Sequence, residues 1–270
     1  MLTVLHHDAD LVVIDKPPGL LVHRSQLDRH ETRFAVQLLR DQIGQRVWPV
    51  HRLDKGTSGV LVFALRADVA ATLGSQFQRG EVSRRYLAIV RGHPPADGLI
   101  DHPLDTPGDA YEDRDCGEAR PARTVFRRLA DVELPIAIER YPTSRYALLA
   151  LYPLSGRRHQ LRRHLKHIAH PIIGDATYGK GRHNRFFASE LGVGRLLLAC
   201  TALAFRHPRD QRPLLIATPP GDGFSLLTQR FGWDAASLAA TDVDTSGNRA
   251  IIKNFPSGNS SVGRAQPCQG

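Results

Sequence analysis

The chain has 270 residues, 41% of them hydrophobic, which is enough to bury one large core or two small ones. Its 36 Lys and Arg residues exceed its 27 Asp and Glu residues, and the resulting formal charge of +9 favours a nucleic-acid partner. The cysteines form no C-x-x-C pair and no apolar run reaches the ~18 residues of a membrane span, so we expect a soluble cytoplasmic protein without a disulfide framework or a cysteine zinc site.

In the first ninety residues, apolar runs and periodic patterns predict strands at 2–5, 11–14, 60–65 and 84–90. A helix is predicted over residues 32–43. A second helix is predicted from Ala67 to Phe77, because apolar residues recur there at a spacing of four. The Pro- and Gly-containing run KPPGLLVH, which follows the second strand, predicts a loop.

Beyond residue 90, the stretch 98–123 is rich in Asp, Gly, Pro and Glu and is predicted to be a loop or an insertion. A basic helix is expected over about 157–169, with Leu161, Leu165 and Ile168 on its inner face. Strands dominate without regular strand–helix alternation, which favours an α+β fold with a mixed, largely antiparallel sheet flanked by helices and loops. The remaining predicted elements are strands at 124–129, 146–152 and 195–205 and a short helix at 226–233.

The composition changes from about Asp234 onward, where Ser, Gly, Asn and Ala occur without sustained periodicity. We therefore expect residues 1–233 to form the folded domain and 234–270 to be a disordered or loosely attached tail. Its end, SSVGRAQPCQG, resembles the translation of a transfer-RNA gene, because Val-Gly-Arg-Ala can be encoded by the D-arm consensus. The hypothesis is that the reading frame continues into a downstream gene, so a chain ending near Ala240 should keep full activity.

The segment His51–Gly59, HRLDKGTSG, is polar and turn-forming, and it leads directly into a predicted buried strand. Arg52 and Asp54 project on the same side of an extended backbone, and a guanidinium beside a carboxylate keeps it ionised, as a nucleophile must be. Taken alone, an Asp in such a pattern more often organises the turn with its side chain. The segment makes Asp54 a candidate nucleophile, with turn formation as the alternative.

The whole segment resembles the His-Arg-Leu-Asp-x-x-Thr-Ser-Gly signature of the RluA-type pseudouridine synthases. Two later segments resemble the family's second and third motifs in the same order: SRRYLAIVRG, which contains Tyr86, and SGRRHQLR, which ends at Arg162. The resemblance covers residues 2 to about 233 and implies the pseudouridine synthase catalytic fold. It also implies that Asp54, Tyr86 and Arg162 are catalytic.

Position alone gives Tyr86 and Arg162 simpler interpretations, because a Tyr on an apolar strand usually packs in the core and an Arg on a basic helix usually faces solvent. In the predicted helix, however, Arg162 lies at the edge of the inner apolar face. From there, the charge of Arg162 can reach a pocket at the start of the helix. The family resemblance implies that Arg162 pairs with Asp54 and keeps it ionised. It implies that Tyr86 packs against the target uracil and accepts or relays a proton.

The resemblance further implies that Asp54 attacks the nucleotide, either at C1′ or through an equivalent glycal route. The N1–C1′ bond breaks, the base rotates and C5 rejoins the sugar, without redox change or phosphate transfer. No cofactor is expected. His164, His167 and His170 recur at a spacing of three, but no paired Cys or carboxylate completes a metal set, so we expect phosphate contacts or surface exposure and no metal.

Contacts with RNA are expected from basic residues near the motifs. Arg52 is expected to fill the gap left by the extruded base or to hold a neighbouring phosphate. Because the chain begins directly with the catalytic domain, we expect the RNA contacts to come from that domain, and we expect a monomer. The other expected RNA-binding residues are Lys16, Arg157, Arg158, Arg163 and Lys166.

Segments such as LLVHRSQLDRHET, LRDQIGQRV and RYPTSRYALLAL resemble family members that modify transfer RNA, at uridine 65 of the acceptor-side stem. One departure is Leu196–Cys200, LLLAC, where relatives read Leu-x-Leu-His-Ala, and it puts any contact of that imidazole in doubt. The alternatives are the same reaction on large-subunit ribosomal RNA, a non-catalytic RNA-binding protein or chaperone, and a metal-dependent nuclease.

Overall fold

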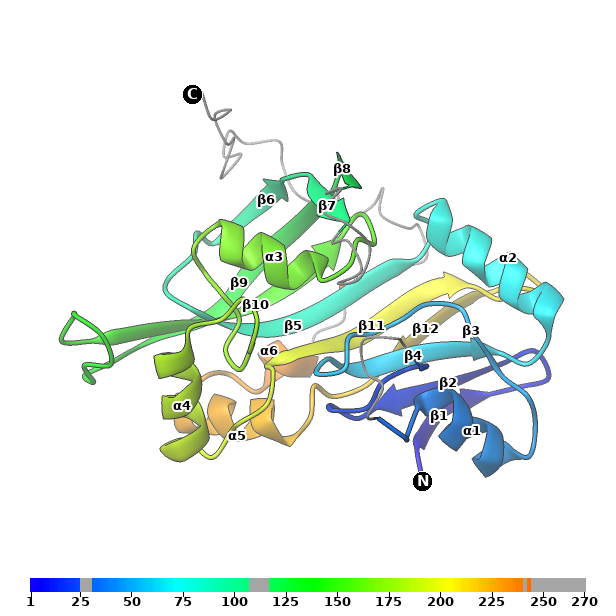
Figure 1. Ribbon diagram of the computed structural model, residues 1–270, viewed down its shortest axis with the longest axis horizontal. Coiled ribbons are helices and arrows are strands. Elements are labelled where there is room, and N and C mark those ends of the chain that lie inside the picture. Colours follow the sequence, from blue (N-terminus) through cyan, green and yellow to red (C-terminus); the bar gives the residue numbers. More distant parts are fainter. Residues whose placement is uncertain (25–30, 107–116, 240–241, 244–270) are drawn as a thin grey trace. The chain divides into compact units, whose positions relative to one another are not determined.

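The computed structural model describes residues 1–24, 31–106, 117–239 and 242–243, and Figure 1 traces its elements along the chain. The chain divides into two compact units. Of the described residues, the first unit comprises those from Met1 to Leu87 and those from Arg195 onward, and the second comprises those from Ala88 to Gly194. Strand β5, Ser83–Arg91, begins in the first unit and ends in the second.

The first unit contains strands β1 Thr3–His7, β2 Leu11–Lys16, β3 Trp48–Pro49, β4 Ser58–Ala64, β11 Leu198–Arg206 and β12 Pro213–Ala217, and helices α1 Ala35–Ile43, α2 Ala67–Gln78, α5 Asp222–Arg230 and α6 Ala236–Ala239. The strand order is β1-β2-β4-β11-β5, with β3 paired to β4 and β12 to β11. Strands β4 and β11 run parallel, whereas β2 pairs antiparallel with both β1 and β4.

Strand β4 forms the centre of this unit because all seven residues of SGVLVFA are buried. A continuous apolar run of this kind is typical of a strand that is covered on both faces. Helix α2 packs beside it (Figure 1), with Val69 and Leu73 buried. The Gln76 side chain links this helix to β11 by donating to the Arg206 carbonyl (2.9 Å) and accepting from the Arg206 amide (3.1 Å).

The second unit contains strands β6 Asp97–Asp101, β7 Leu104–Thr106, β8 Gly117–Arg120, β9 Arg123–Leu134 and β10 Ser144–Pro153, and helices α3 Gln160–His167 and α4 Gly181–Ser189. The strand order is β5-β10-β9-β6, and β7 and β8 form a separate pair. Strands β9 and β10 pair antiparallel from Ser144 opposite Leu134 to Pro153 opposite Thr124. Helix α3 packs on β10, whose residues from Tyr146 to Tyr152 are buried.

The α+β class and the mixed, mostly antiparallel sheet are confirmed. The prediction of a loop over 98–123 was wrong for its described parts, because β6, β7 and β8 lie there. These short strands carry few apolar residues, and their backbone groups are satisfied by pairing with partners that a local pattern does not reveal. Among the described residues, every helix is too short or too polar to cross a membrane.

The expected boundary at Asp234 lies too early. Helix α6 follows it, and Val243 is buried. Asp234 begins this helix, since its carboxylate accepts the Ala236 amide (2.9 Å) and its carbonyl accepts the Ser237 hydroxyl (2.6 Å). Most of the expected tail, residues 240–241 and 244–270, lies outside the described residues.

Candidate active site

Asp54 lies in the loop between β3 and β4, where it is half-buried beside the exposed Arg52. The backbone carbonyl of Asp54 accepts the amide of Thr57 (3.0 Å) and closes the turn that leads into β4. The main chain of Asp54 thus takes part in the turn that the sequence pattern predicts.

His51 fixes the start of the Asp54 loop. Its Nε2 accepts the backbone amide of Val62 in β4 (3.1 Å), and its ring stacks on Phe77 of α2 with centroids 4.8 Å apart. Burial lowers the pKa of His51 to about 3, and the charge of Arg84 contributes in the same direction. The ring is therefore neutral at pH 7, as its role as an acceptor requires.

Lys16 holds the other side of the same loop, in a way that corrects its expected role. Its ammonium is buried and donates to the carbonyls of Pro17 (2.9 Å), Leu20 (2.7 Å) and Lys55 (3.3 Å). Burial lowers the pKa of Lys16 to about 7, with the charge of Arg195 adding to the effect. An ammonium enclosed by three carbonyls has no surface for a phosphate, so the prediction that Lys16 contacts RNA was wrong.

Tyr86 is buried on β5, and the pKa values of Tyr86 and of the buried Cys200 on β11 affect one another. Burial raises the pKa of Tyr86 well above its usual value, helped by Cys200, and burial also raises the pKa of Cys200 to about 12. Both groups are thus protonated at pH 7. The charge of Asp54 acts on the pKa values of both Tyr86 and Lys16, which places these three residues in one neighbourhood of the first unit.

The departure at Ala199 and Cys200 lies inside the first unit. Both residues are fully buried on β11, where Ala199 pairs with Ser58 and Cys200 with Gly59. Arg195, which the sequence patterns did not single out, donates to the Ser58 hydroxyl (2.6 Å). This segment therefore supports the end of the Asp54 loop from within the protein.

Arg162 lies on α3 in the second unit and is mostly buried, in contrast to a solvated face. Its Nε and Nη2 donate to the two carboxylate oxygens of Asp175 at 2.7 and 2.9 Å. Its guanidinium lies 5.1 Å from the centre of the Tyr178 ring. Burial alone would raise the pKa of Asp175, but hydrogen bonds from Arg162 and from backbone amides lower it on balance. Asp175 thus fixes Arg162 as an ion pair.

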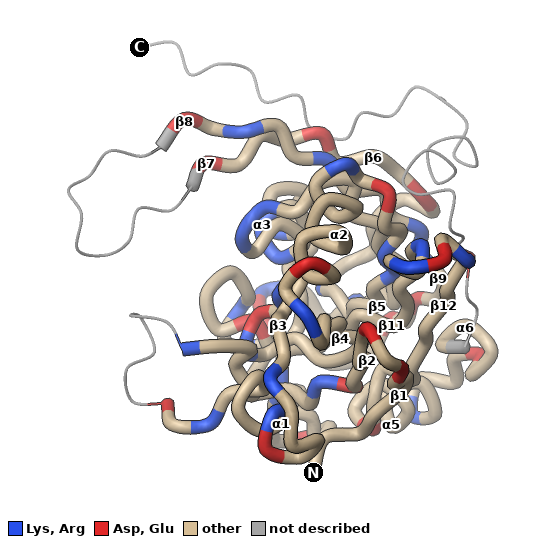
Figure 2. Tube along the Cα trace, turned by 90° about the vertical axis from the view of Figure 1, so that its right-hand side faces the viewer, with Lys and Arg blue, Asp and Glu red and all other residues tan. Residues whose placement is uncertain are grey.

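The other expected RNA-binding residues of this region differ in exposure. Arg157 and Lys166 are exposed, whereas Arg158 and Arg163 are half-buried, and Figure 2 shows this positive charge along α3. Arg163 is already bound by Asp105, through both its carbonyl and its carboxylate. Of these four residues, Arg157 and Lys166 are therefore the most open to solvent.

The prediction of surface or phosphate contacts was wrong for His164. Its ring is buried between the hydroxyl of Thr124 (2.9 Å) and the carbonyl of His102 (3.0 Å). His167 stacks on the ring of His102 with centroids 3.7 Å apart, and His170 contacts the carbonyl of Arg91. These histidines pack the helix against its own unit.

One carboxylate and imidazole cluster, among the described residues, has the spacing of metal ligands. Ligand atoms of Asp8, Asp10 and His207 lie within 4.8 Å of one another. Both oxygens of Asp10 bind Arg209, at 2.7 Å each, and His207 Nε2 lies 3.2 Å from Asp8. Side-chain cations already neutralise the cluster, so its geometry supports an ion-pair network.

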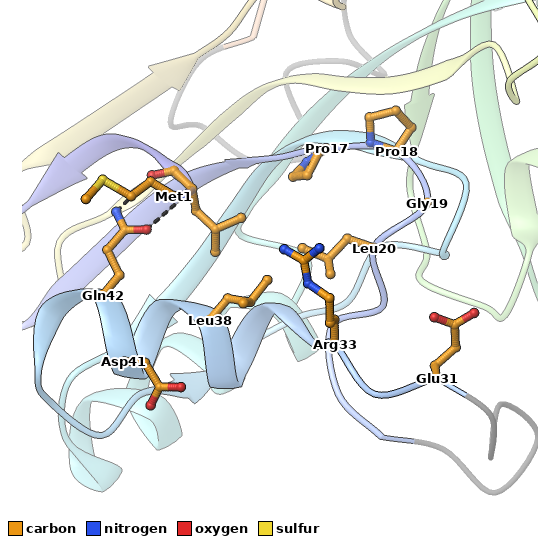
Figure 3. A pocket seen from close by; sticks show the side chains of 11 residues that line it. Met1, Pro17, Pro18, Gly19, Leu20, Glu31, Arg33, Leu38, Asp41 and Gln42 are labelled. Atoms are coloured by element: carbon orange, nitrogen blue, oxygen red, sulfur yellow. Dashed lines mark hydrogen bonds between the residues drawn. The ribbon is translucent and has the colours of Figure 1, made fainter.

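A pocket of about 700 Å³ lies beside the loop that Lys16 binds. Figure 3 shows the Arg33 guanidinium beside Leu20 at this pocket, and Gln42 hydrogen-bonded to the main chain of Leu2. None of the expected catalytic side chains lines it. The lining residues are Met1, Leu2, Pro17, Pro18, Gly19, Leu20, Glu31, Arg33, Leu38, Asp41 and Gln42.

Residues 10–167, which contain all three motifs, match the family described as RNA pseudouridylate synthase. The chain belongs to this family. It is 46% identical over 242 residues to tRNA pseudouridine synthase C of Vibrio cholerae, covering 88% of this chain and 99% of the relative. It is 47% identical over 240 residues to the protein of the same name from Pasteurella multocida, again covering 88% and 99%.

Solved structures of the family share the fold. Human RNA pseudouridylate synthase domain containing 4 aligns with a TM-score of 0.62 at 26% identity, over 85% of this chain and 93% of that one. Human RNA pseudouridylate synthase domain containing 1 gives the same TM-score at 25% identity, over 81% and 83%. Family membership makes the chain an isomerase and confirms the resemblance drawn from its motifs.

Proposed function

We propose that the chain converts a uridine of transfer RNA to pseudouridine, with Asp54 as the nucleophile, without metal or cofactor and as a monomer. The observation that carries the proposal is the construction of the Asp54 loop. His51 and Lys16 hold the main chain on either side of the carboxylate, near a buried tyrosine. The relatives named as tRNA synthases, similar over nearly their whole length, support transfer RNA as the substrate.

In this proposal the Asp54 carboxylate breaks the N1–C1′ bond by direct attack or through a glycal, and the base turns before C5 bonds to the sugar. Tyr86 acts through its ring against the uracil. Its hydroxyl stays protonated because burial raises its pKa, and a protonated phenol is a poor proton acceptor. The role implied for Arg162, keeping Asp54 ionised, stays a prediction from the family resemblance.

The finer substrate is uridine 65 in the acceptor-side stem. A uridine inside a duplex must be flipped out at a cost of a few kcal/mol, and exposed basic residues such as Arg52, Arg157 and Lys166 can offset that cost through phosphate contacts. The proposed substrate also fits the expected cytoplasmic location.

The deciding experiment is the release of tritium from 5-tritiated uridine in bulk transfer RNA. Asp54→Asn keeps the size of the side chain but removes the nucleophile, so turnover should fall by ~10³-fold or more while RNA binding is unchanged. Asp41→Asn, at an exposed position of α1, is the matched control and should behave as wild type. Normal turnover by Asp54→Asn would exclude Asp54 as the nucleophile.

The substrate is tested separately, by mapping pseudouridine in transfer and ribosomal RNA from cells that lack the protein. Loss at position 65 of transfer RNA is expected. Loss at a ribosomal site with transfer RNA unchanged would assign the same reaction to ribosomal RNA. Absence of any loss would favour a non-catalytic RNA-binding protein, and cleavage of RNA that a chelator stops would indicate a nuclease.

A further inference from the structure

Arg85 is a buried charge immediately beside Tyr86 on β5. It is only 1% exposed, whereas Arg84 is half-buried. Side chains alternate between the faces of a strand, so Arg85 points away from the face that carries Tyr86. A guanidinium remains protonated in proteins, and a buried charge of this kind requires a counter-charge and hydrogen-bond acceptors.

Among the described residues, the Arg85 side chain has three partners, and two of them come from the C-terminal part of the first unit. Nη2 donates to the carbonyl of Ser237 (3.3 Å), and Nε lies 3.0 Å from the carboxylate of Asp242. The third partner is the hydroxyl of Thr201 on β11, which accepts from Nη1 (3.0 Å). Of these three partners, only Asp242 supplies a negative charge.

We call the described residues 234–239 and 242–243 the C-terminal strap. Packing fixes the strap at both ends. Trp233, which precedes it, is 9% exposed and contacts the Phe231 ring, and Val243 at its end is 6% exposed. Between Trp233 and Val243, the hydrogen bond from the Ala236 amide to Asp234 orders the turn at α6. This turn presents the Ser237 carbonyl to Arg85. The strap is therefore built to reach Arg85.

We propose that Asp242 is a positioning residue for Tyr86, which it reaches through Arg85. Its carboxylate neutralises Arg85 and so keeps that side chain on its face of β5. Without the carboxylate, the guanidinium keeps only the neutral acceptors Thr201 and Ser237, so we expect it to shift and to displace the adjoining backbone of Tyr86. The inference rests on the proposed function in one respect, namely that the position of Tyr86 matters for turnover.

This proposal replaces the expectation that a chain ending near Ala240 keeps full activity, because such a chain lacks Asp242. It also explains why ordered structure continues beyond residue 233. If the strap served only to cover apolar surface, the buried Val243 would be sufficient and no carboxylate would be needed beside Arg85.

The test uses the full chain with single substitutions, assayed for tritium release well below the melting temperature of each variant. Asp242→Ala and Asp242→Asn should lower kcat by about tenfold with KM for transfer RNA within twofold of wild type, a kinetic pattern that removal of an RNA contact would not give. Asp242→Glu should restore most of kcat. Asp41→Ala, on an exposed surface, is the matched control.

A double variant separates charge compensation from simple covering. Arg85→Met/Asp242→Ala contains no unpaired buried charge, so it should have a higher kcat than Asp242→Ala alone. Wild-type kcat in Asp242→Ala, or an additional loss in the double variant, would overturn the proposal. A lower melting temperature with unchanged kcat would also overturn it, because the strap would then serve stability alone.

A readout independent of catalysis distinguishes failure of the strap proposal from failure of the proposed function. Tyrosine is replaced throughout by 3-fluorotyrosine, and Tyr86 is assigned among the six tyrosines with Tyr86→Phe. Its fluorine resonance should shift in Asp242→Ala and return in Asp242→Glu. If the wild-type protein is inactive on every RNA but the Tyr86 resonance shifts in Asp242→Ala, the proposed function is wrong and the proposed link from Asp242 to Tyr86 is supported. If wild type is active and the resonance does not move, the strap proposal fails.

Discussion

At the scale of single residues, buried side chains next to Asp54 act as ligands for backbone groups. His51 accepts one amide and the Lys16 ammonium binds three carbonyls, so the loop that carries the proposed nucleophile is held through its main chain. A side-chain ligand for an otherwise unpaired buried amide is worth about 1–3 kcal/mol when it is lost. The position of Asp54 thus depends on side chains that bind the main chain around it.

Exchange of His51 tests this dependence. His51→Gln keeps an acceptor within reach of the Val62 amide, whereas His51→Phe keeps the stack on Phe77 but leaves the amide unpaired. We expect kcat to fall by about tenfold in His51→Phe and by less than threefold in His51→Gln. Tritium release checks this, with His7→Phe at an exposed position of β1 as control. Equal activity of the two variants would show that the acceptor is not required.

His164 predicts how the stability of the protein depends on pH. Burial lowers the pKa of His164 from 6.5 to about 4, so between these values the unfolded chain binds a proton that the folded chain does not. Stability from this residue is fully present above pH 6.5 and is lost as the pH falls toward 4, by about 3 kcal/mol. Urea unfolding midpoints at pH 7, 5.5 and 4.5 should therefore fall less steeply for His164→Gln than for wild type. Parallel pH profiles would contradict the assignment.

Two roles that the sequence suggested for basic residues were wrong. Asp54 and Tyr86 lie in one neighbourhood, because the charge of Asp54 acts on the pKa of Tyr86. Lys16 and His164 were assigned to the surface because a sequence shows that a residue is basic but not whether it is buried. His51 is part of the first motif, yet its acceptor role depends on Val62, eleven positions away in a different element.

At the scale of elements, the parallel pairing of β4 and β11 determines the conformation of the chain where the Asp54 loop enters β4. Gly59 has a φ of 110°, and a Cβ atom there would lie 2.0 Å from the carbonyl oxygen of Cys200. The two strands can approach this closely only with glycine at that position. The Thr-Ser-Gly end of the first motif is therefore explained by packing against β11.

Gly59→Ala should destabilise the fold by at least about 2–3 kcal/mol, because the strained φ and the clash with backbone add together. Gly74→Ala in α2 is the matched control, since no atom lies within 4 Å of its Cβ position. It should leave the protein unchanged or stabilise it by about 0.5–1 kcal/mol. Urea denaturation measures both. Equal stability of the two variants would contradict this account of β4.

At the scale of the whole molecule, local periodicity predicted the helices and strands that have strong apolar patterns. It missed the elements that form only by pairing or packing with segments elsewhere in the chain. The buried strand β4 and helix α2 were predicted almost to the residue. Strands β6 and β12 and helix α4 are short and half-exposed, so their sequences do not distinguish them from loops. The ordered part of the strap was missed because its main partner, Arg85, lies about 150 residues earlier in the chain.

The parallel β4–β11 pair also affects when the Asp54 loop can take its final shape during synthesis. The hydrogen bond from Arg195 to Ser58 joins residues 137 positions apart. A ribosome adding roughly 5–20 residues per second exposes all three motifs before β11 emerges. A nascent chain therefore carries the proposed nucleophile for several seconds without the strand that supports its loop, and we expect the loop to become fixed only after β11 has emerged.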